Sequence, residues 1–318
     1  MESEALKAYK KAGHIWLKTI KFSKKKAKEG AMLFDLAESI EQLIKEEGGQ
    51  PAFPVNLSVG EEAAHFTPKW NDVAILEKSD LLKIDVGVSF EGYIADGAIT
   101  INLDNNYSKQ IEANILALEN AISVTGYGRP IEKIGIEIER TLKEKGFNPV
   151  YNLGGHGLEK NNIHAPPRIP NHGGGSKERL EEGAIAIEPF ASTGAGHVSE
   201  VQSVEIFASN EKKAVRNNYA REILKIIQKY EGRPFAERWV RKELQINDRD
   251  NNDISEENHL NNLTKKLTEF QITFGLKELI KSGCITTFPG LKESKGAMVT
   301  QVEKSLLVLE NETIILGE

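Results

Sequence analysis

The order of predicted elements constrains this fold most, because two helices followed by several short strands occur twice along the chain. In the first half, apolar residues recur at helical spacing over residues 3–29 and 32–47. Short strand-like runs separated by turn residues follow at Val55–Val59, Val73–Ile75, Leu81–Val88 and Ala98–Leu103. This order predicts an α+β fold.

The second half has the same order. Residues 108–125 and 130–145 are predicted to be helices, and Gly146 ends the second one. Strands are then predicted at Tyr151–Gly157, Ala184–Phe190 and Val201–Ala208. The two halves share no convincing residue-level repeat, so we predict a similarity of structure only.

Residues 210–283 break the pattern of the second half. They are predicted to be mainly helical, with one or two helices over 258–282. Between the helices lies Asn247–Asn258, a polar segment that offers nothing to a core. Because Met298–Leu309 returns to strand character, we interpret the block as a helical insertion within a single domain spanning residues 1–318.

Charge and cysteine content limit the partners and the compartment. A net charge of -6 over 318 residues gives no whole-protein attraction to nucleic acid or anionic lipid. Cys284 is the only cysteine, which excludes an intrachain disulfide and fits a reducing compartment. No apolar run is long enough to span a membrane, so we expect a cytoplasmic protein without membrane contact.

One local charge feature allows two interpretations. The segment Lys18–Lys28 is strongly basic although the chain as a whole is acidic. It is either a solvated helix face or a contact to an acidic partner such as ribosomal RNA. The sequence leaves both interpretations open.

Two aspartates lie in apolar, strand-like surroundings, where a carboxylate is costly unless it is paired or bound to a cation. Asp85 and Asp96 are separated by enough residues for a strand, a turn at Glu91–Gly92 and a returning strand. A hairpin of that size would bring both carboxylates to one side of a sheet. The alternative is that each aspartate caps a turn, as Asp96 before Gly97 could.

Further candidate ligands come from the second half. His156 is surrounded by glycines that would let other groups approach its imidazole, and His164 follows eight residues later. Glu188 ends one apolar strand-like run, and Glu303 lies in another that reads as a central strand. Taken singly, either histidine could be a hydrogen-bonded structural residue, and either glutamate could pair with a lysine.

The set of residues is more informative than its members. Two aspartates, two glutamates and one histidine offer hard oxygen ligands and one imidazole, which suits two divalent ions that share carboxylates. Two such ions roughly 3.5–4 Å apart can hold a bridging hydroxide and stabilise the oxyanion of amide hydrolysis. The segments around these residues are PAFPVNLSVGEEAAHFTP, KIDVGVSFEGYIADGA, GGHGLEKNNIHAPPRIPN, IAIEPFASTGAG, TTFPGL and QVEKSLLV.

In these segments, in their order and in their spacing, the chain resembles the type 2 methionine aminopeptidases of the pita-bread metallopeptidase superfamily, in their archaeal form. The resemblance covers nearly the whole chain, and the helical block at 210–283 resembles the insertion that separates type 2 from type 1. It implies a pita-bread fold, with two pseudo-symmetric halves around a curved antiparallel sheet.

The resemblance also implies a role for each candidate ligand. Asp85 would be the two-oxygen ligand of one metal, and Asp96 and Glu303 would bridge both metals. His156 and Glu188 would complete the other metal site, and Glu188 would also be the general base. The ions would be Co, Mn, Fe or Zn, and a metal-bound hydroxide would attack the scissile carbonyl.

The substrate-handling residues are implied in the same way. His65 would contact the scissile amide, and His164 would hydrogen-bond the substrate backbone or the intermediate. The methionine pocket would be formed by Phe53, Ile163, Phe288 and Pro234. No residue is predicted to bind the free N-terminal amine of the substrate.

The implied activity is removal of the initiator methionine from the N-termini of nascent peptides with a small second residue. A monomer is our default expectation, because the sequence does not determine the oligomeric state. Any ribosome docking would have to use the catalytic domain. The competing hypotheses are an aminopeptidase of the same fold that cleaves before proline, and a non-catalytic relative that binds protein or RNA. The second hypothesis conflicts with the presence of all five ligand residues, Asp85, Asp96, His156, Glu188 and Glu303.

Overall fold

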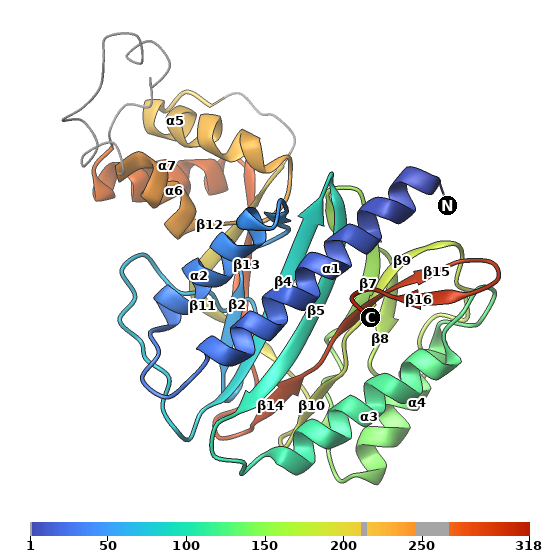
Figure 1. Ribbon diagram of the computed structural model, residues 1–318. Coiled ribbons are helices and arrows are strands. Elements are labelled where there is room, and N and C mark those ends of the chain that lie inside the picture. Colours follow the sequence, from blue (N-terminus) through green and yellow to red (C-terminus); the bar gives the residue numbers. More distant parts are fainter. Residues whose placement is uncertain (1, 211–214, 246–266) are drawn as a thin grey trace.

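The computed structural model describes residues 2–210, 215–245 and 267–318 (Figure 1). Its helices are α1 (Ser3–Lys26), α2 (Leu33–Glu46), α3 (Ser108–Val124), α4 (Glu132–Glu144), α5 (Asn218–Ile227), the 3-10 helix η1 (Gln228–Tyr230), α6 (Glu237–Gln245) and α7 (Glu269–Lys281). Among these helices, none is both long and apolar enough to cross a membrane.

The strands of the described residues pair in antiparallel fashion throughout. In the first half they are β1 (Gln50–Pro51), β2 (Asn56–Val59), β3 (Glu62–Ala64), β4 (Leu81–Phe90) and β5 (Tyr93–Asn102). The remaining strands are β6 (Asn148–Pro149), β7 (Gly154–Glu159), β8 (Asn162–Pro170), β9 (Gly183–Ile187), β10 (Phe190–Ser192), β11 (Ser199–Ser209), β12 (Phe235–Ala236), β13 (Ile285–Lys292), β14 (Val299–Gln301), β15 (Lys304–Val308) and β16 (Thr313–Ile315).

The predicted hairpin between the two aspartates is confirmed. Strands β4 and β5 pair over their whole length, and only Glu91 and Gly92 connect them. Both connecting residues have positive φ angles, 53° and 87°, as the favoured two-residue hairpin turn requires. Asp96 lies opposite Gly87, two residues from Asp85, so both aspartates point to the same face of the sheet.

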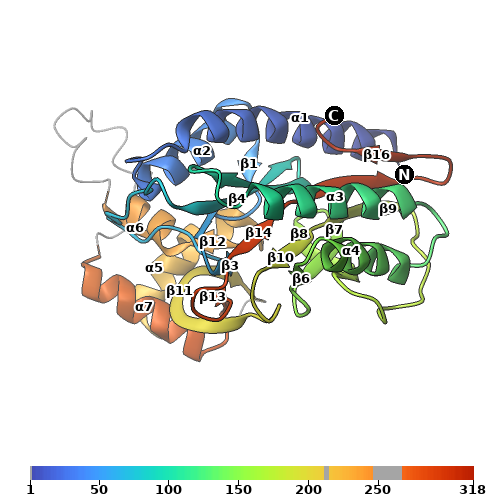
Figure 2. The ribbon, with the colours of Figure 1, turned by 90° about the horizontal axis from the view of Figure 1, so that it is seen from below.

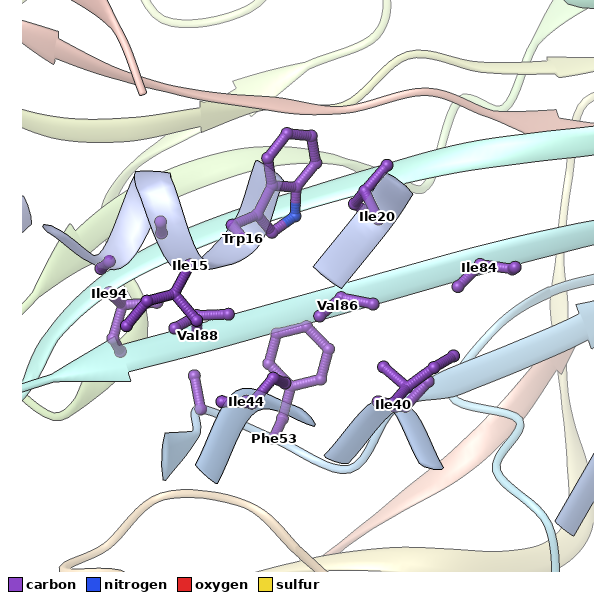
Figure 3. Close-up of a cluster of buried hydrophobic side chains, with 14 of the residues drawn as sticks. Ile15, Trp16, Ile20, Ile40, Ile44, Phe53, Ile84, Val86, Val88 and Ile94 are labelled. Atoms are coloured by element: carbon purple, nitrogen blue, oxygen red, sulfur yellow. The ribbon is translucent and has the colours of Figure 1, made fainter. Parts of the chain in front are cut away.

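The opposite face of this hairpin forms the first hydrophobic core. Strand β4 alternates, with Leu82, Ile84, Val86 and Val88 facing the helices, while from Lys83 to Ser89 the residues facing the other way are polar or small. Figure 3 shows Ile84, Val86 and Val88 packed against side chains of α1 and α2, namely Ile15, Trp16, Ile20, Ile40 and Ile44. The two helices therefore cover one face of the sheet and leave the aspartate face to the functional site.

Trp16 joins helix α1 to the strand that carries Asp96. Its indole is buried, and Nε1 donates to the carbonyl oxygen of Gly97 over 3.1 Å. A Cβ atom on Gly97 would lie 2.4 Å from the indole ring, so only glycine lets the strand approach this closely. Trp16→Ala is expected to lower the free energy of unfolding by about 3–5 kcal/mol in a urea titration.

The matched control for Trp16→Ala is Lys21→Ala, on the exposed side of the same helix. This change is expected to alter stability by less than about 0.5 kcal/mol. Equal effects of the two substitutions would contradict the role of Trp16 in the core.

The second half repeats the arrangement, as predicted. Helices α3 and α4 pack side by side against the strands of the second half (Figures 1 and 2), where they bury a second apolar cluster. Ile134 and Ile138 of α4 meet Ile185 and Leu306 of the sheet in this cluster. Two helix pairs thus cover one curved layer of antiparallel strands.

The two halves meet where β5 runs beside the segment that holds β14 and β15. Ser305 Oγ accepts from the Asp96 backbone N–H over 2.7 Å and donates to the Asp96 carbonyl over 2.8 Å. The Glu303 backbone N–H donates to the Ala98 carbonyl over 3.0 Å. Thr100 makes a similar two-way contact with the Gln301 backbone. These bonds fix Asp96 and Glu303 as neighbours across the boundary.

Four strand predictions were wrong in detail. Val73–Ile75 is a loop in which Ile75 makes only an isolated bridge to Met32, because no continuous strand pairs with this short run. The strand predicted at Tyr151–Gly157 begins at Gly154. The strands predicted at Ala184–Phe190 and Met298–Leu309 are each interrupted, at Glu188–Pro189 and at Val302–Glu303.

The predicted helical block leaves the sheet and returns to it at one point, because Ser209 of β11 pairs with Ile285 of β13. Helices α5, α6 and α7 lie together beyond these two strands (Figure 1) and have their own buried cluster. Thr268 caps α7, where its side chain accepts from the Gln271 backbone N–H. The predicted polar segment 247–258 lies outside the described residues.

Candidate metal centre

A cavity of about 550 Å³ lies on the aspartate face of the sheet. Both halves and the helical block contribute to its wall, and every residue that the sequence singled out lines it. They are Phe53, His65, Asp85, Asp96, His156, Ile163, His164, Glu188, Pro234, Phe288 and Glu303. The structure therefore brings together residues that are up to 250 positions apart in the sequence.

Three of the predicted ligands form the tightest group. One ligand atom from each of Asp96, His156 and Glu303 can be chosen so that all lie within 4.8 Å of one another. His156 Nε2 is 3.7 Å from Asp96 Oδ2 and 3.8 Å from Glu188 Oε1, which adds the second glutamate. These separations leave room for a cation between the side chains.

The two glutamates reach the site because their strands are interrupted at the same level. Ile187 pairs with Lys304, and Phe190 pairs with Gln301, so the residues between these pairs face each other. Pro189 has no N–H to give to a ladder, which favours the interruption after Glu188. Glu188 and Glu303 occupy the two facing interruptions. The prediction that Glu303 lies within a continuous central strand was therefore wrong.

Asp85 is connected to the group through Gln301, a residue that sequence reasoning missed. Gln301 is buried, and its Nε2 donates to Asp85 Oδ2 over 3.3 Å and to Glu188 Oε2 over 3.4 Å. Its position two residues before Glu303 was the available signal, since alternate residues of an extended segment point the same way. Gln301 thus holds two carboxylates that come from different halves.

The loss of this amide should weaken metal binding. Gln301→Met keeps the volume but removes the donor shared by Asp85 and Glu188, and we expect metal affinity to fall about 10–100-fold. Titration calorimetry with Mn²⁺ would measure the change. Gln202→Met, at an exposed position, is the control. Unchanged affinity in the Gln301 variant would show that the amide does not position the carboxylates.

The electrostatics of the site favour a bound cation. Burial raises the pKa of Asp85 to about 7. Burial and then mutual repulsion raise the pKa values of Asp96, Glu188 and Glu303 well above the ordinary range. One oxygen each of Asp85, Asp96 and Glu303 is buried without a hydrogen-bond partner. Buried carboxylates without partners are costly, and a divalent cation would supply what these oxygens lack. The donor set therefore fits a divalent metal.

His156 is prepared to act as a ligand. Its Nδ1 is 3.2 Å from the carbonyl oxygen of Gly157, and an Nδ1–H donated there leaves a lone pair on Nε2, the nitrogen that faces the carboxylates. Burial lowers the pKa of His156 to about 3, so the imidazole is neutral at physiological pH. A Cβ atom on Gly155 or Gly157 would collide with backbone carbonyls, which explains the glycines beside this histidine.

Two more histidines stand around the cluster. The His164 ring lies edge-on to the His156 ring, with centroids 4.8 Å apart, and His65 lies edge-on to Phe288. His65 has a φ of 64°, a left-handed conformation that is uncommon outside glycine and frequent at functional sites. Burial lowers the pKa of His65 to about 4 and also lowers that of His164. Both can therefore donate or accept a hydrogen bond as neutral rings.

The rest of the cavity wall is largely apolar, although Asn152 and Arg168 also line it. It contains the predicted Phe53, Ile163, Phe288 and Pro234, and also Phe190 and Ile206, which were not predicted. Gly87 makes room for one of these rings, because a Cβ atom there would lie 2.2 Å from Phe53 Cε1. A polar exception is Asn56, which pairs with Asp85 across β2 and β4 and has a buried Oδ1 without a partner.

Comparison with known proteins places the chain in a family. The model of metallopeptidase family M24 matches residues 7–216. A methionine aminopeptidase of Pyrococcus horikoshii is 39% identical over 310 residues, covering 96% of this chain and 97% of the relative. A methionine aminopeptidase of Archaeoglobus fulgidus is 36% identical over 310 residues, covering 97% of both.

Solved structures show the same fold. A methionine aminopeptidase from Thermotoga maritima superposes with a TM-score of 0.68 at 19% identity, covering 100% of this chain and 98% of the other. A thermophilic Arx1 superposes with a TM-score of 0.79 at 19% identity, covering 100% of this chain and 91% of the Arx1 chain. A prolidase from Pyrococcus furiosus gives 0.58 at 18% identity, with coverages of 100% and 64%. The predicted pita-bread architecture is thereby confirmed.

Proposed function

The chain belongs to metallopeptidase family M24, and from this membership we propose that it is a methionine aminopeptidase. It hydrolyses the peptide bond after the initiator methionine of nascent proteins that have a small second residue. The observation that carries the proposal is the placement of the carboxylate and histidine cluster in one wall of a cavity whose remaining wall is largely apolar and aromatic. The chain is 36–39% identical to two methionine aminopeptidases over 310 residues, which supports the same activity.

Two divalent ions are proposed at the cluster, drawn from Co, Mn, Fe and Zn. Asp85 would bind one ion, and His156 and Glu188 would bind the other. Asp96 and Glu303 would each contact both ions. When bound, such a pair lowers the pKa of water and stabilises negative charge on a carbonyl oxygen. The unpartnered oxygens of Asp85, Asp96 and Glu303 support this assignment.

The protein's own groups handle protons and position the substrate. Glu188 is proposed as the general base, because its carboxylate lies in the cavity wall beside His156. The leaving amide nitrogen must receive a proton. His65 and His164 line the cavity, which supports the proposal that their neutral imidazoles contact the scissile amide or the tetrahedral oxyanion. We assign them these substrate-contacting roles.

The apolar wall is proposed as the methionine pocket. An unbranched thioether against aromatic rings gains about 0.3–1.5 kcal/mol per contact, and Phe53 and Phe288 provide the rings. A single methylene changes binding by only about 1–3 kcal/mol, so selection of methionine depends on a close fit. Pro234, between η1 and β12, adds a contact from the helical block.

Domain extent, oligomeric state, location and ribosome contact are also proposed. We propose one catalytic domain over residues 1–318, with residues 210–283 as an inserted helical subdomain. We propose a monomeric protein of the cytoplasm, where nascent N-termini occur and where its only cysteine, Cys284, would stay reduced. A contact with the ribosome is proposed through the catalytic domain.

A substrate comparison tests the activity. Release of methionine from Met-Ala-Ser should be much faster than release of the first residue from an Xaa-Pro peptide. A prolidase shares the fold, so the opposite preference would favour the proline-cleaving alternative and overturn the proposal. No bound divalent metal after purification, together with no activity after Co, Mn or Fe is added, would favour a non-catalytic relative.

A further inference from the structure

Helix α1 and the short segment after it present a row of lysines that the proposed activity does not use. Its members are Lys7, Lys10, Lys11, Lys18, Lys21, Lys24, Lys25 and Lys28, all exposed, and we call them the lysine ridge. Lys7, Lys11, Lys18, Lys21 and Lys25 recur at spacings of three, four or seven, so they follow one side of the helix. At a rise of about 1.5 Å per residue, the 18 steps from Lys7 to Lys25 extend over about 27 Å of the helix.

The ridge is not needed to fold the helix onto the sheet. The packing face of α1 is the opposite one, where Ala12, Ile15, Trp16 and Ile20 are buried. Any polar residue would serve the fold on the exposed side. The repeated choice of lysine there requires a different explanation.

Most of the ridge lysines form no ion pair with an acidic residue in the part of the chain that the structure describes. Lys18 pairs with Glu47 of the α2 end over 2.7 Å. Among the residues that the structure describes, the other ridge lysines form no ion pair. Their charges are therefore available to an external anion.

Charge is also strongly segregated along the chain. Residues 3–28 contain nine lysines and one acidic residue, Glu4, which gives +8. The net charge of -6 for the whole chain then leaves -14 on the rest. A polyanion would be attracted to α1 and repelled by the remaining surface, so the ridge would orient the protein as well as bind it.

The ridge lies away from the catalytic cavity. Helix α1 runs across the outer side of the β4–β5 hairpin, and Figure 2 shows it along one edge of the molecule. Asp85 and Asp96 of the same hairpin point to the opposite side of the sheet. A partner seated on the ridge would leave the cavity free for a peptide.

We propose that the lysine ridge docks the protein on the phosphate backbone of an RNA duplex. Lysine side chains bind phosphates as point charges, without base recognition. None of the large apolar side chains of α1 is exposed, so the helix has nothing to insert into a membrane or to stack on unpaired bases. RNA is chosen over DNA because the proposed substrate, a nascent chain, emerges from an RNA-rich particle, and only this choice rests on the proposed function.

The first test measures binding of a 20-base-pair RNA duplex by fluorescence anisotropy over a range of KCl concentrations. The ridge variant carries Lys11→Gln, Lys18→Gln, Lys21→Gln and Lys25→Gln. We expect at least a tenfold loss of affinity at low salt and a shallower dependence of log affinity on log salt, since each phosphate contact contributes about 0.7–0.9 to that slope. Lys109→Gln, Lys133→Gln, Lys145→Gln and Lys177→Gln, all at exposed positions, give a control variant of equal net charge.

A second variant tests the sign of the effect. Glu47→Gln removes the acid that pairs with Lys18, so RNA affinity should rise about twofold to threefold. Equal losses in the ridge and control variants would mean that only net charge matters, which would overturn the proposal. Binding to phosphatidylserine vesicles or polyglutamate but not to RNA would also overturn it.

Peptide hydrolysis separates this proposal from the proposed function. The ridge variant should release methionine from Met-Ala-Ser at the wild-type rate, because none of its changed residues lines the cavity. An inactive wild-type protein that still binds RNA through the ridge would refute the activity and leave the docking surface intact. An active protein whose RNA affinity is unaffected by the ridge changes would refute only the docking surface.

Discussion

Glu303→Gln is expected to lower the release of methionine by at least about a thousandfold while the protein remains folded. Glu303 is buried, belongs to the tightest ligand group and has an oxygen without a partner. The amide keeps the shape of the side chain but removes one negative charge and one strong oxygen donor. A buried cluster that loses a shared carboxylate can no longer neutralise two divalent ions.

Two measurements distinguish this effect from a loss of fold. Metal content after dialysis should fall in the variant, and the urea unfolding midpoint should stay at or above the metal-free wild-type value. Glu312→Gln makes the same chemical change at an exposed position and should keep full activity. Turnover near the wild-type rate in the Glu303 variant would refute the ligand assignment.

The metal-free protein is expected to lose stability as pH rises above about 6.5, and divalent metal should restore it. Asp85 has an ordinary pKa of 3.8, and burial raises it to about 7 in the folded protein. A carboxyl with a raised folded pKa stabilises the fold fully below the unfolded pKa, and this contribution disappears as pH rises through the folded value. Asp96, Glu188 and Glu303 shift in the same direction.

The histidines limit the pH window for this test. Burial lowers the folded pKa values of His156 to about 3 and of His65 to about 4, from 6.5. The neutral histidines contribute to folding stability above their unfolded pKa, and this contribution is lost as pH falls. Below about pH 6.5, stability therefore rises with pH through the histidines while it falls with pH through the carboxyls. Above that pH the carboxylates act alone, and each one still protonated costs up to about 1.4 kcal/mol per pH unit.

Chemical denaturation between pH 6.5 and 8.5, with and without a chelator, would measure the effect. We expect a loss of stability in the chelated protein, a shallower loss in chelated Asp85→Asn, and little loss with Mn²⁺ present. Chelated wild-type protein whose stability rises or stays constant over this range would contradict the raised pKa values.

Much of the site could be predicted because its chemistry is local to each segment. A carboxylate in an apolar strand, such as Asp85, or an imidazole among glycines, such as His156, is unusual enough to be noticed without a structure. Spacing also predicted the hairpin, since only a two-residue turn fits between β4 and β5. The resemblance then identified His65 and Phe53, whose local sequence carries no chemical signal of its own.

Other features could not be read from the chain because they depend on pairs of distant segments. The interruptions at Glu188 and Glu303 face each other only because β9 pairs with β15 and β10 pairs with β14. Gln301 links carboxylates from two halves, and a glutamine in a strand-like run gives no sign of its partners. The short run Val73–Ile75 shows the converse, since its β-branched residues found no continuous partner strand.

The sequence by itself determined the repeated order of helices and strands, the hairpin and the identities of the five candidate ligands, because these depend on residue type and short-range spacing. The tertiary structure decided which oxygens meet, how the two glutamates leave their strands and that the lysines of α1 face away from the cavity. These features depend on which strands pair across the two halves and on which face of the helix is buried in the core. Long-range pairing brings residues such as Asp96 and Glu303 into contact, and no local pattern in either segment records the position of the other.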